Sequence, residues 1–395
     1  MAFPMRFRLS LLTLVLSAAG LALPVRAAAP PPEGILAAIP SAGEAPVALL
    51  VDLSSGQVLH ARNPDRRFMP ASVTKVMTLY LAFELIEAGK LDPAQVFTMS
   101  PVIARDWRRK GSTMFLDTGE RVRVDDLLLG IANVSANDGA AVLAAGQAGS
   151  IEAWTAQMNA TARALGMRGS HFGTPNGWPD EGRTFTTAND LITLARAMLA
   201  RHPDKFGYYV GRMGFDYKGI AQINHDPMIG KIAGADGIKT GFTNESGFSY
   251  LGTARRNGQR LALVLAGVEN GRLRGRLARS YIEWGFAAFE RRRLFDPGEV
   301  IGKARVQDGA ARGVSLVARG PVGVNLARGT KGRLTATIRY EGPLQAPLAK
   351  GDQVAMLEVS GPGIAPASIP LYAAEAVDTA GPLDRIINAV AGLFT

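Results

Sequence analysis

The sequence predicts an α+β protein in which helices flank an antiparallel sheet, followed by a small domain made only of strands. Strand-like segments occur at both ends of residues 46–292, and amphipathic helical segments lie between them. Residues 296–375 contain short alternating runs separated by Gly-Pro and Gly-Asp turns. Strands on either side of a block of helices are typical of a layered α+β domain, and a chain of 395 residues has room for two or three domains.

The segments follow this order along the chain. A hairpin of two strands is expected over residues 47–63, and a helix is expected to begin at Ser72 and to stop near Gly89. Asn257-Gly258 predicts a tight turn between two later strands. Further helices are expected at 124–133, 139–146, 151–166, 187–200 and 276–293, and further strands at 237–243, 247–256, 260–268, 334–340 and 354–361.

The N-terminal residues 1–27 are expected to be a secretory signal peptide. Arg6 and Arg8 precede an apolar run over residues 9–23, and small residues follow up to a cleavage site expected after Ala27. The apolar run is shorter than the ~20 residues that a membrane-spanning helix needs. Residues 28–45 are rich in Ala, Pro and Gly and are expected to be a linker.

Charge and composition restrict the partners. The net charge is +10, and loss of the three arginines of residues 1–27, which contain no acid, leaves +7. An exported protein with this charge is expected to meet anionic lipid or an acidic wall polymer, and not nucleic acid. The chain has no cysteine, and its four histidines show no ligand pairing, so neither a disulfide nor a metal cofactor is expected.

Ser72 and Lys75 form the first chemical motif, Ser-x-x-Lys, at the start of the expected helix. Residues i and i+3 lie on one helix face, so the amine of Lys75 can reach the hydroxyl of Ser72. A serine becomes a strong nucleophile when a base removes its proton, and Lys75 can be that base only when neutral. Burial and a second cation, Lys239, are the expected causes of a lowered Lys75 pKa.

Two further motifs follow: Ser135-Ala136-Asn137 in a loop between helices, and Lys239-Thr240-Gly241 on a strand. Ser135 is expected to relay a proton to the leaving amine, and Asn137 to hold an amide of the substrate. Lys239 and Thr240 suit a terminal carboxylate. The backbone N–H groups of Ser72 and Phe242, the residue after Gly241, are expected to form the oxyanion hole. Each motif alone is weak evidence, but their joint occurrence in this order predicts a serine acyl-enzyme.

The three motifs in this order resemble those of penicillin-binding proteins and serine β-lactamases. The surrounding segments PASVTKVMTLYLAFE, HFGTPNGW and ADGIKTGFTNESGF are similar to low-molecular-weight penicillin-binding proteins of the D-alanyl-D-alanine carboxypeptidase type. The resemblance implies a transpeptidase-like catalytic domain at 46–292 and a C-terminal β-sandwich at 296–375. It also implies peptidoglycan stem peptides as substrates and β-lactams as covalent inhibitors, in the periplasm.

The sequence departs from the family pattern at three positions. Ala136 stands where glycine is common, Phe242 where histidine is frequent, and Trp178 where leucine is expected. Alternatives also remain: a β-lactamase, a DD-endopeptidase, or a non-catalytic wall-binding protein of the same fold. Against a β-lactamase, the chain shows no Glu-x-x-Leu-Asn element that would supply a dedicated deacylation base.

The C-terminal residues 381–395 are expected to form an amphipathic helix, with Pro382 in its first turn. Its apolar residues recur at helical spacing and are Leu383, Ile386, Ile387, Val390, Leu393 and Phe394. Such a stripe can lie on a membrane surface or dock on its own β-domain. A peripheral anchor to the inner membrane is the favoured interpretation, and the resembling carboxypeptidases carry one.

Overall fold

The computed structural model describes residues 43–327, 330 and 332–381. The signal peptide predicted at 1–27, most of the linker and the helix predicted beyond Gly381 lie outside these residues. The chain divides into two compact units. The larger contains residues 43–53 and 59–287, and the smaller contains residues 54–58 and the described part of 288–381.

The larger unit is built on a five-stranded sheet with strand order β2-β1-β9-β8-β7. Neighbouring strands from β1 to β7 run antiparallel, as predicted, and Val47 of β1 pairs with Ala266 of β9. Asn257 and Gly258 have positive φ angles of 47° and 78°, which gives the predicted tight turn between β8 and β9. The strands are β1 (Val47–Asp52), β2 (Gln57–Arg62), β7 (Ala235–Thr243), β8 (Gly247–Arg256) and β9 (Gln259–Val268).

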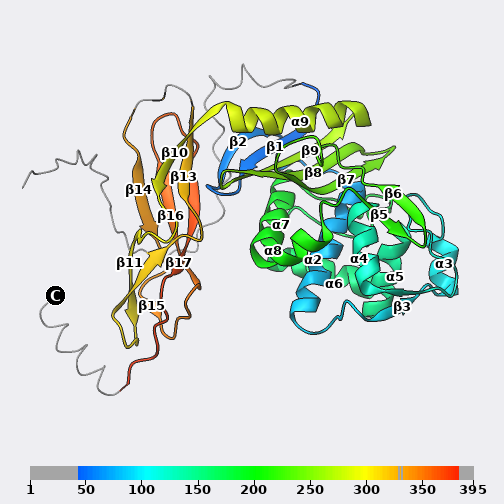
Figure 1. Cartoon of the computed structure of the whole chain (residues 1–395), viewed down its shortest axis with the longest axis horizontal. Helices are drawn as coiled ribbons and strands as arrows, with labels where there is room; N and C mark the ends of the chain where they lie inside the picture. The colour runs from blue at the N-terminus through cyan, green and yellow to red at the C-terminus, as the bar shows by residue number, and fades with distance from the viewer. Residues whose placement is uncertain (1–42, 328–329, 331, 382–395) are drawn as a thin grey trace, which may run out of the picture. The chain divides into compact units, whose positions relative to one another are not determined.

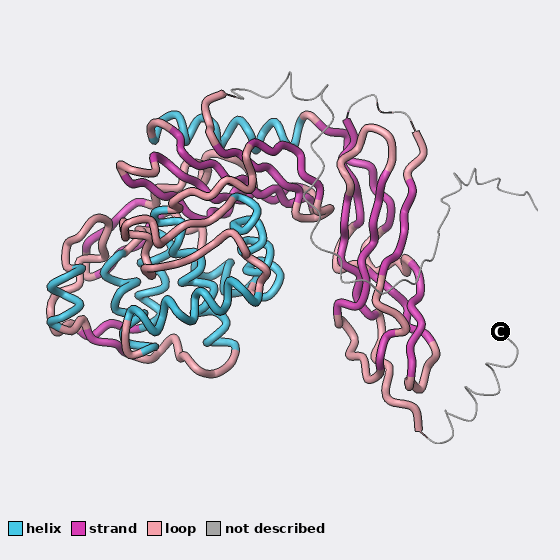
Figure 2. The backbone as a smooth tube through the Cα atoms, turned by 180° about the vertical axis from the view of Figure 1, so that it is seen from behind, coloured by secondary structure: helices cyan, strands magenta, loops and turns pink. Residues whose placement is uncertain are grey.

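Helices cover both faces of this sheet (Figures 1 and 2). Helix α9 lies on one face and the remaining helices lie on the other. Helix α2 is central to that second layer, because every residue from Lys75 to Phe83 is buried. The helices are α2 (Lys75–Glu87), α3 (Pro101–Trp107), α4 (Val124–Asn133), α5 (Asn137–Ala148), α6 (Ile151–Ala164), α7 (Ala188–Arg201), α8 (Pro203–Tyr209) and α9 (Gly271–Ala287).

Short elements complete the helical layer. A 3₁₀ turn, η1 (Ala71–Thr74), leads directly into α2, so Ser72 lies in this turn and not in the α-helix itself. Two small hairpins pair β3 (Val96–Thr98) with β4 (Arg121–Arg123), and β5 (Gly214–Tyr217) with β6 (Ile220–Ile223). No helix in the described part of the chain is long and apolar enough to span a membrane.

The helix predicted at 276–293 was wrong at its C-terminal end. Helix α9 ends at Ala287, and β10 (Phe289–Phe295) pairs antiparallel with β13 (Val322–Ala327). The division between the two compact units falls between Ala287 and Ala288, where α9 ends. The arginines of β10 are good helix formers, and pairing with a distant strand overrides that local preference.

The smaller unit contains the predicted all-β domain. A six-stranded sheet has the order β14-β16-β17-β12-β11-β15, and β10 and β13 form a second sheet. Val324 of β13 belongs to the same buried cluster as Leu316, Leu357 and Leu371 of the larger sheet, so the two sheets share one core. The remaining strands are β11 (Gly302–Gln307), β12 (Gly313–Val317), β14 (Thr335–Arg339), β15 (Leu344–Gln345), β16 (Gln353–Ser360) and β17 (Ala367–Ala373).

Candidate active site

Ser72 and Lys75 meet as the sequence predicts. The Lys75 Nζ lies 2.9 Å from the Ser72 Oγ, within hydrogen-bond distance. The 3₁₀ turn places Ser72 one turn before the first residue of α2, where it is partly exposed, while Lys75 is fully buried. A substrate can therefore approach the hydroxyl, and the amine behind it is shielded from water.

Lys75 also contacts two fixed oxygens. Its Nζ lies 2.7 Å from the Oδ1 of Asn137 and 2.8 Å from the main-chain oxygen of Asn176. A neutral amine has two hydrogens and one lone pair. If both hydrogens are donated to these two carbonyl oxygens, the lone pair faces the Ser72 hydroxyl. This arrangement orients Lys75 as a proton acceptor toward Ser72.

Burial favours the neutral state that a base requires. Burial, and then the charge of Lys239, hold the pKa of Lys75 well below its usual range, and Asp138 opposes the shift. Burial, and then the charge of Arg274, lower the pKa of Lys239 to about 7, against the opposing charge of Asp226. Two buried lysines that repel each other cannot both stay protonated at low cost, so the pair favours one proton over two.

Main-chain atoms hold the turn that carries Ser72. A Cβ added to Gly177 would lie 1.8 Å from the oxygen of Ala71, and one added to Gly241 would lie 2.5 Å from the oxygen of Pro70. Gly177 has a φ of +73°, a region that glycine enters without strain. Ala71 itself has a φ of +50°, which is unusual for a residue with a Cβ. Strand β7 and the loop at Gly177 therefore both pack closely against the main chain of the turn that carries Ser72.

The middle motif forms the turn between α4 and α5. Ser135 is buried and has a φ of +63°, so strained backbone occurs in the second motif and at Ala71, the residue before the first motif. Asn137 is the first residue of α5 and is joined by hydrogen bonds to Lys75 and to the main-chain oxygen of Lys110. The structure therefore connects Ser72, Lys75 and Asn137 directly and places Ser135 two residues before Asn137.

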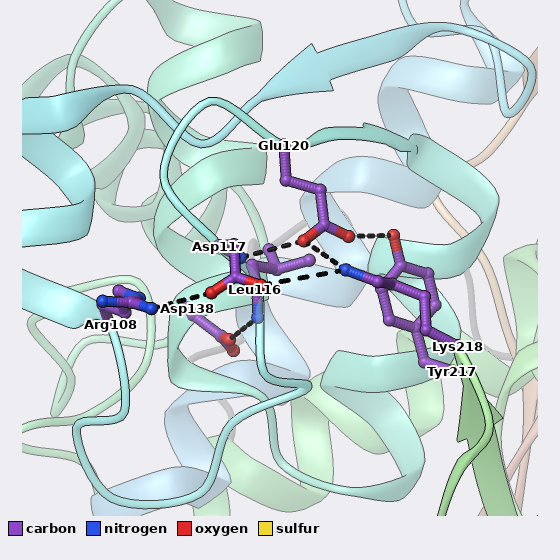
Figure 3. Close-up of polar contacts among 7 residues, drawn as sticks. All are labelled: Arg108, Leu116, Asp117, Glu120, Asp138, Tyr217 and Lys218. Carbon is purple, nitrogen blue, oxygen red and sulfur yellow. Dashed lines mark hydrogen bonds and ion pairs between the residues drawn. The ribbon is translucent and has the colours of Figure 1, made fainter.

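Asp138 fixes the adjoining loop, residues 108–120. Its buried carboxylate accepts hydrogen bonds from the backbone N–H groups of Met114 and Leu116, the latter drawn in Figure 3. The far end of the loop is held by Glu120, which accepts from the hydroxyl of Tyr217 and the amine of Lys218 on and beside β5 (Figure 3). The loop of residues 108–120, which lies next to Asn137, is thus hydrogen-bonded both to α5 and to the β5–β6 hairpin.

The third motif lies on β7, with Lys239 and Thr240 buried. Phe242 is about half exposed, and its ring stacks on Phe248 with the centroids 4.2 Å apart. The position of Gly241 against η1 brings this segment of β7 beside the turn that carries Ser72. Strand pairing and this close approach therefore assemble the first and third motifs, which are far apart in sequence.

The sequence alone did not reveal a polar cluster around Lys239. Asp226 is buried and accepts a hydrogen bond from the Tyr250 hydroxyl, with the Tyr250 oxygen 3.0 Å from its Oδ2. Arg274 of α9 lies close enough to Lys239 to lower its pKa, and its Nε is buried without a hydrogen-bond partner in the described structure. Arg274 lies in an arginine-rich stretch of α9, where the sequence does not distinguish it from the exposed Arg272 and Arg276.

Asn176 was likewise missed as a contact of Lys75. It lies in the segment Thr174-Pro175-Asn176-Gly177, whose turn composition predicts a loop but not a catalytic neighbour. Among the described residues no group of three or more His, Cys, Asp or Glu side chains could hold a metal ion. The groups available for catalysis at this site are the hydroxyl of Ser72, the amines of Lys75 and Lys239, and the side-chain amide of Asn137.

Comparison with known proteins places this geometry in a family. The family model described as D-alanyl-D-alanine carboxypeptidase matches residues 36–270. The chain belongs to this family. A second model, described as the C-terminal domain of penicillin-binding protein 5, matches residues 289–379. The carboxypeptidase family model thus spans all three motifs, and the second covers nearly all of the described β-domain.

Curated relatives and solved structures agree with this assignment to the carboxypeptidase family. The D-alanyl-D-alanine carboxypeptidase DacA of Haemophilus influenzae is 31% identical over 359 residues, which covers 88% of this chain and 90% of the relative. DacF of Bacillus subtilis is 29% identical and covers 86% and 87%. The crystal structure of penicillin-binding protein 5 from Haemophilus influenzae has a TM-score of 0.69 at 29% identity, covering 85% of this chain and 98% of that one.

Proposed function

We propose that this serine-type carboxypeptidase removes the terminal D-alanine of peptidoglycan stem peptides through an acyl-enzyme on Ser72. The observation that carries the proposal is the position of the buried Lys75 amine, 2.9 Å from the Ser72 Oγ and held by two carbonyl oxygens. A buried, neutral amine directed at a serine hydroxyl is the arrangement that general-base activation of a nucleophile requires.

In the acylation step, the Ser72 Oγ attacks the carbonyl carbon between the last two residues while its proton moves to Lys75. The carbonyl oxygen gains negative charge, which the backbone N–H groups of Ser72 and Phe242 would stabilise. The C–N bond then breaks, and the departing amine takes up the proton that Lys75 accepted, with Ser135 as the relay. Water next attacks the ester and loses a proton to the neutral Lys75. The bond between the acyl carbon and the Ser72 Oγ breaks, Lys75 returns that proton to the Ser72 Oγ, and the shortened peptide leaves.

Recognition of the free C-terminus is assigned to the cationic cluster on β7 and α9. Lys239 and Thr240 provide a positive charge and a hydroxyl donor for a carboxylate. Arg274 adds a second positive charge, and its buried, unpartnered Nε makes an anionic ligand favourable beside it. A terminal carboxylate is what separates a carboxypeptidase substrate from the internal peptide bond of an endopeptidase substrate.

We place the mature protein in the periplasm, peripheral on the inner membrane. The sequence supports this through the charged and apolar pattern of residues 1–27 and the apolar stripe of residues 382–395. β-Lactams are proposed as covalent inhibitors, because they present a strained amide to the same serine.

The test is to measure D-alanine released from a pentapeptide ending in D-Ala-D-Ala, and to map the adduct left by a β-lactam. We expect D-alanine release and a single labelled peptide that contains Ser72, both lost in Ser72→Ala. A β-lactam label that persists in Ser72→Ala would show that another residue is the nucleophile. Rapid steady-state hydrolysis of penicillin without D-alanine release would favour a β-lactamase instead.

A further inference from the structure

We propose that Lys110 is a positioning residue of the active site. Its ammonium lies over the indole rings of both Trp107 and Trp178, and its main-chain oxygen sets which end of the Asn137 amide faces Lys75. We call the arrangement of Trp107, Lys110 and Trp178 the aromatic clamp. The inference rests on the proposed function, because its effect is on the Ser72 reaction.

The aromatic clamp joins two segments that are distant in sequence. The Nζ of Lys110 lies 4.9 Å from the ring centroid of Trp107 and 4.9 Å from that of Trp178. The two indoles meet edge to face, with centroids 6.2 Å apart and planes at 85°. A cation within about 6 Å of an indole face is attracted by the ring quadrupole, and here one cation has two such partners.

The main-chain oxygen of Lys110 can only accept hydrogen bonds. It accepts from the Nδ2 of Asn137 at 2.9 Å, and the Oδ1 at the other end of that amide accepts from Lys75 at 2.7 Å. A flipped amide would place its oxygen against the oxygen of Lys110 and its N–H₂ group against the amine of Lys75. Both of those contacts are unfavourable, so the Lys110 carbonyl selects the orientation that the Lys75 amine needs.

Gly111 permits this close approach. It has a φ of +68°, and an added Cβ would lie 2.8 Å from the Nδ2 of Asn137 and 2.9 Å from the ring of Trp178. The backbone after Lys110 therefore fits tightly against both the amide and the clamp. Other hydrogen bonds hold the loop after Gly111: the backbone N–H of Asn137 donates to the oxygen of Ser112, and the side chain of Gln222 donates to the oxygen of Thr113. The side chain of Lys110 adds its contacts with the two indoles to these anchors.

Lys110→Met is the first variant, because it removes the cation and keeps a long side chain. We expect kcat/KM for D-alanine release to fall roughly five- to ten-fold, as two cation–π contacts are lost. Lys110→Arg should stay within about two-fold of the native protein, because a guanidinium stacks on indoles equally well. Lys90→Met, at an exposed lysine elsewhere in the same unit, is the matched control and should behave as the native protein.

The pH profile of kcat/KM distinguishes a positioning role of Lys110 from a general loss of activity in the variant. Loss of the Asn137 oxygen removes an acceptor from the Lys75 ammonium, so Lys75 should hold its proton less tightly. The acid limb of kcat/KM should therefore move to lower pH in Lys110→Met and stay in place in Lys110→Arg. A uniform loss of rate at every pH would overturn the positioning role.

Two glycines give a second comparison. Gly111→Ala brings a methyl group against Asn137 and Trp178, whereas Gly119→Ala changes a glycine of φ +81° with nothing within 4 Å of the added Cβ. Both variants carry backbone strain, but only the first should lower kcat/KM by more than about ten-fold. Equal losses in the two variants would mean that strain alone explains the effect.

The aromatic clamp can also be tested by tryptophan fluorescence, a measurement that does not depend on enzyme activity. Lys110→Met should change the fluorescence of Trp107 and Trp178, and Lys110→Arg and Lys90→Met should not. If Lys110→Met does not fold, Trp178→Leu removes one ring and supplies the same kinetic comparison.

Failure of the inference is distinct from failure of the function. If the native protein releases no D-alanine, the proposed function fails, and the rate of Ser72 acylation by a β-lactam then serves to compare the variants. If the native protein is active and Lys110→Met has native kinetics and pH profile, the aromatic clamp has no role in positioning Asn137.

Discussion

Replacing Lys239 by methionine should stabilise the folded protein while it impairs recognition of substrate. Lys239 is almost fully buried, and its pKa is lowered to about 7 from 10.5. One pKa unit corresponds to about 1.4 kcal/mol, so burial of this lysine costs about 4 kcal/mol of folding free energy at pH 7. Methionine keeps the length of the side chain and carries no charge, so this cost is removed.

The sign of the pH dependence follows from proton binding. Between pH 7 and 10.5 the unfolded chain binds more protons at this lysine than the folded chain, so the native protein becomes more stable as the pH rises. The advantage of Lys239→Met should therefore shrink from about 4 kcal/mol at pH 7 to about 1 kcal/mol at pH 9.5. The attraction to Asp226 is already contained in the pKa of about 7, so its loss does not lower this expected gain further.

The assay is urea unfolding at pH 7 and pH 9.5, followed by tryptophan fluorescence. All four tryptophans lie between residues 107 and 284, so the signal reports on the catalytic unit. Lys231→Met, at an exposed lysine, is the control and should change stability little at either pH. Equal stability of Lys239→Met and the native protein at pH 7, or a gain that does not change with pH, would refute the reasoning.

Three further outcomes are expected. Lys75→Arg should lose Ser72 acylation by at least ~10²-fold, because arginine cannot give up a proton, and near-native acylation would identify another group as the base. Amidation of the substrate C-terminus should lower kcat/KM ten-fold or more, since each hydrogen bond to a charged group contributes roughly 1.5–3 kcal/mol. Equal turnover of the amidated and free peptides would show that Lys239 and Thr240 do not bind the terminal carboxylate. A chain that ends at Ala380 should be found in the soluble fraction after cell lysis, whereas the full-length mature protein should be found in the membrane pellet. If both proteins occur in the same fraction, residues 381–395 are not a membrane anchor.

Local sequence patterns predicted the contacts that depend on local geometry. The i, i+3 spacing placed the Lys75 amine at the Ser72 hydroxyl, and the periodicity predicted the helices and strands around each motif. The sequence could not show that Asn176 and Arg274 approach the two lysines. Those approaches depend on long-range packing, and an Asn-Gly loop or an arginine on a helix has the same local pattern whatever it contacts.

The C-terminal end of α9 also could not be predicted from the local sequence pattern. Phe289 to Arg293 continue a helical pattern by composition, and pairing with β13 makes them a strand. The segment from Trp107 to Lys110 has the composition of a solvated basic loop. Its cation–π contacts arise because the loop that carries Trp178 folds against it.

The backbone contacts at Gly177 and Gly241 restrict how this enzyme can evolve under antibiotic selection. The turn that carries Ser72 rests on main-chain atoms of two distant segments, and neither glycine can gain a side chain without displacing it. Substitutions that weaken an inhibitor and keep the natural reaction are therefore expected at side chains rather than at these glycines, for example at the half-exposed Phe242. The position of Ser72 is thus sensitive to substitution at these two glycines, and tolerated variation is expected at exposed side chains near the site.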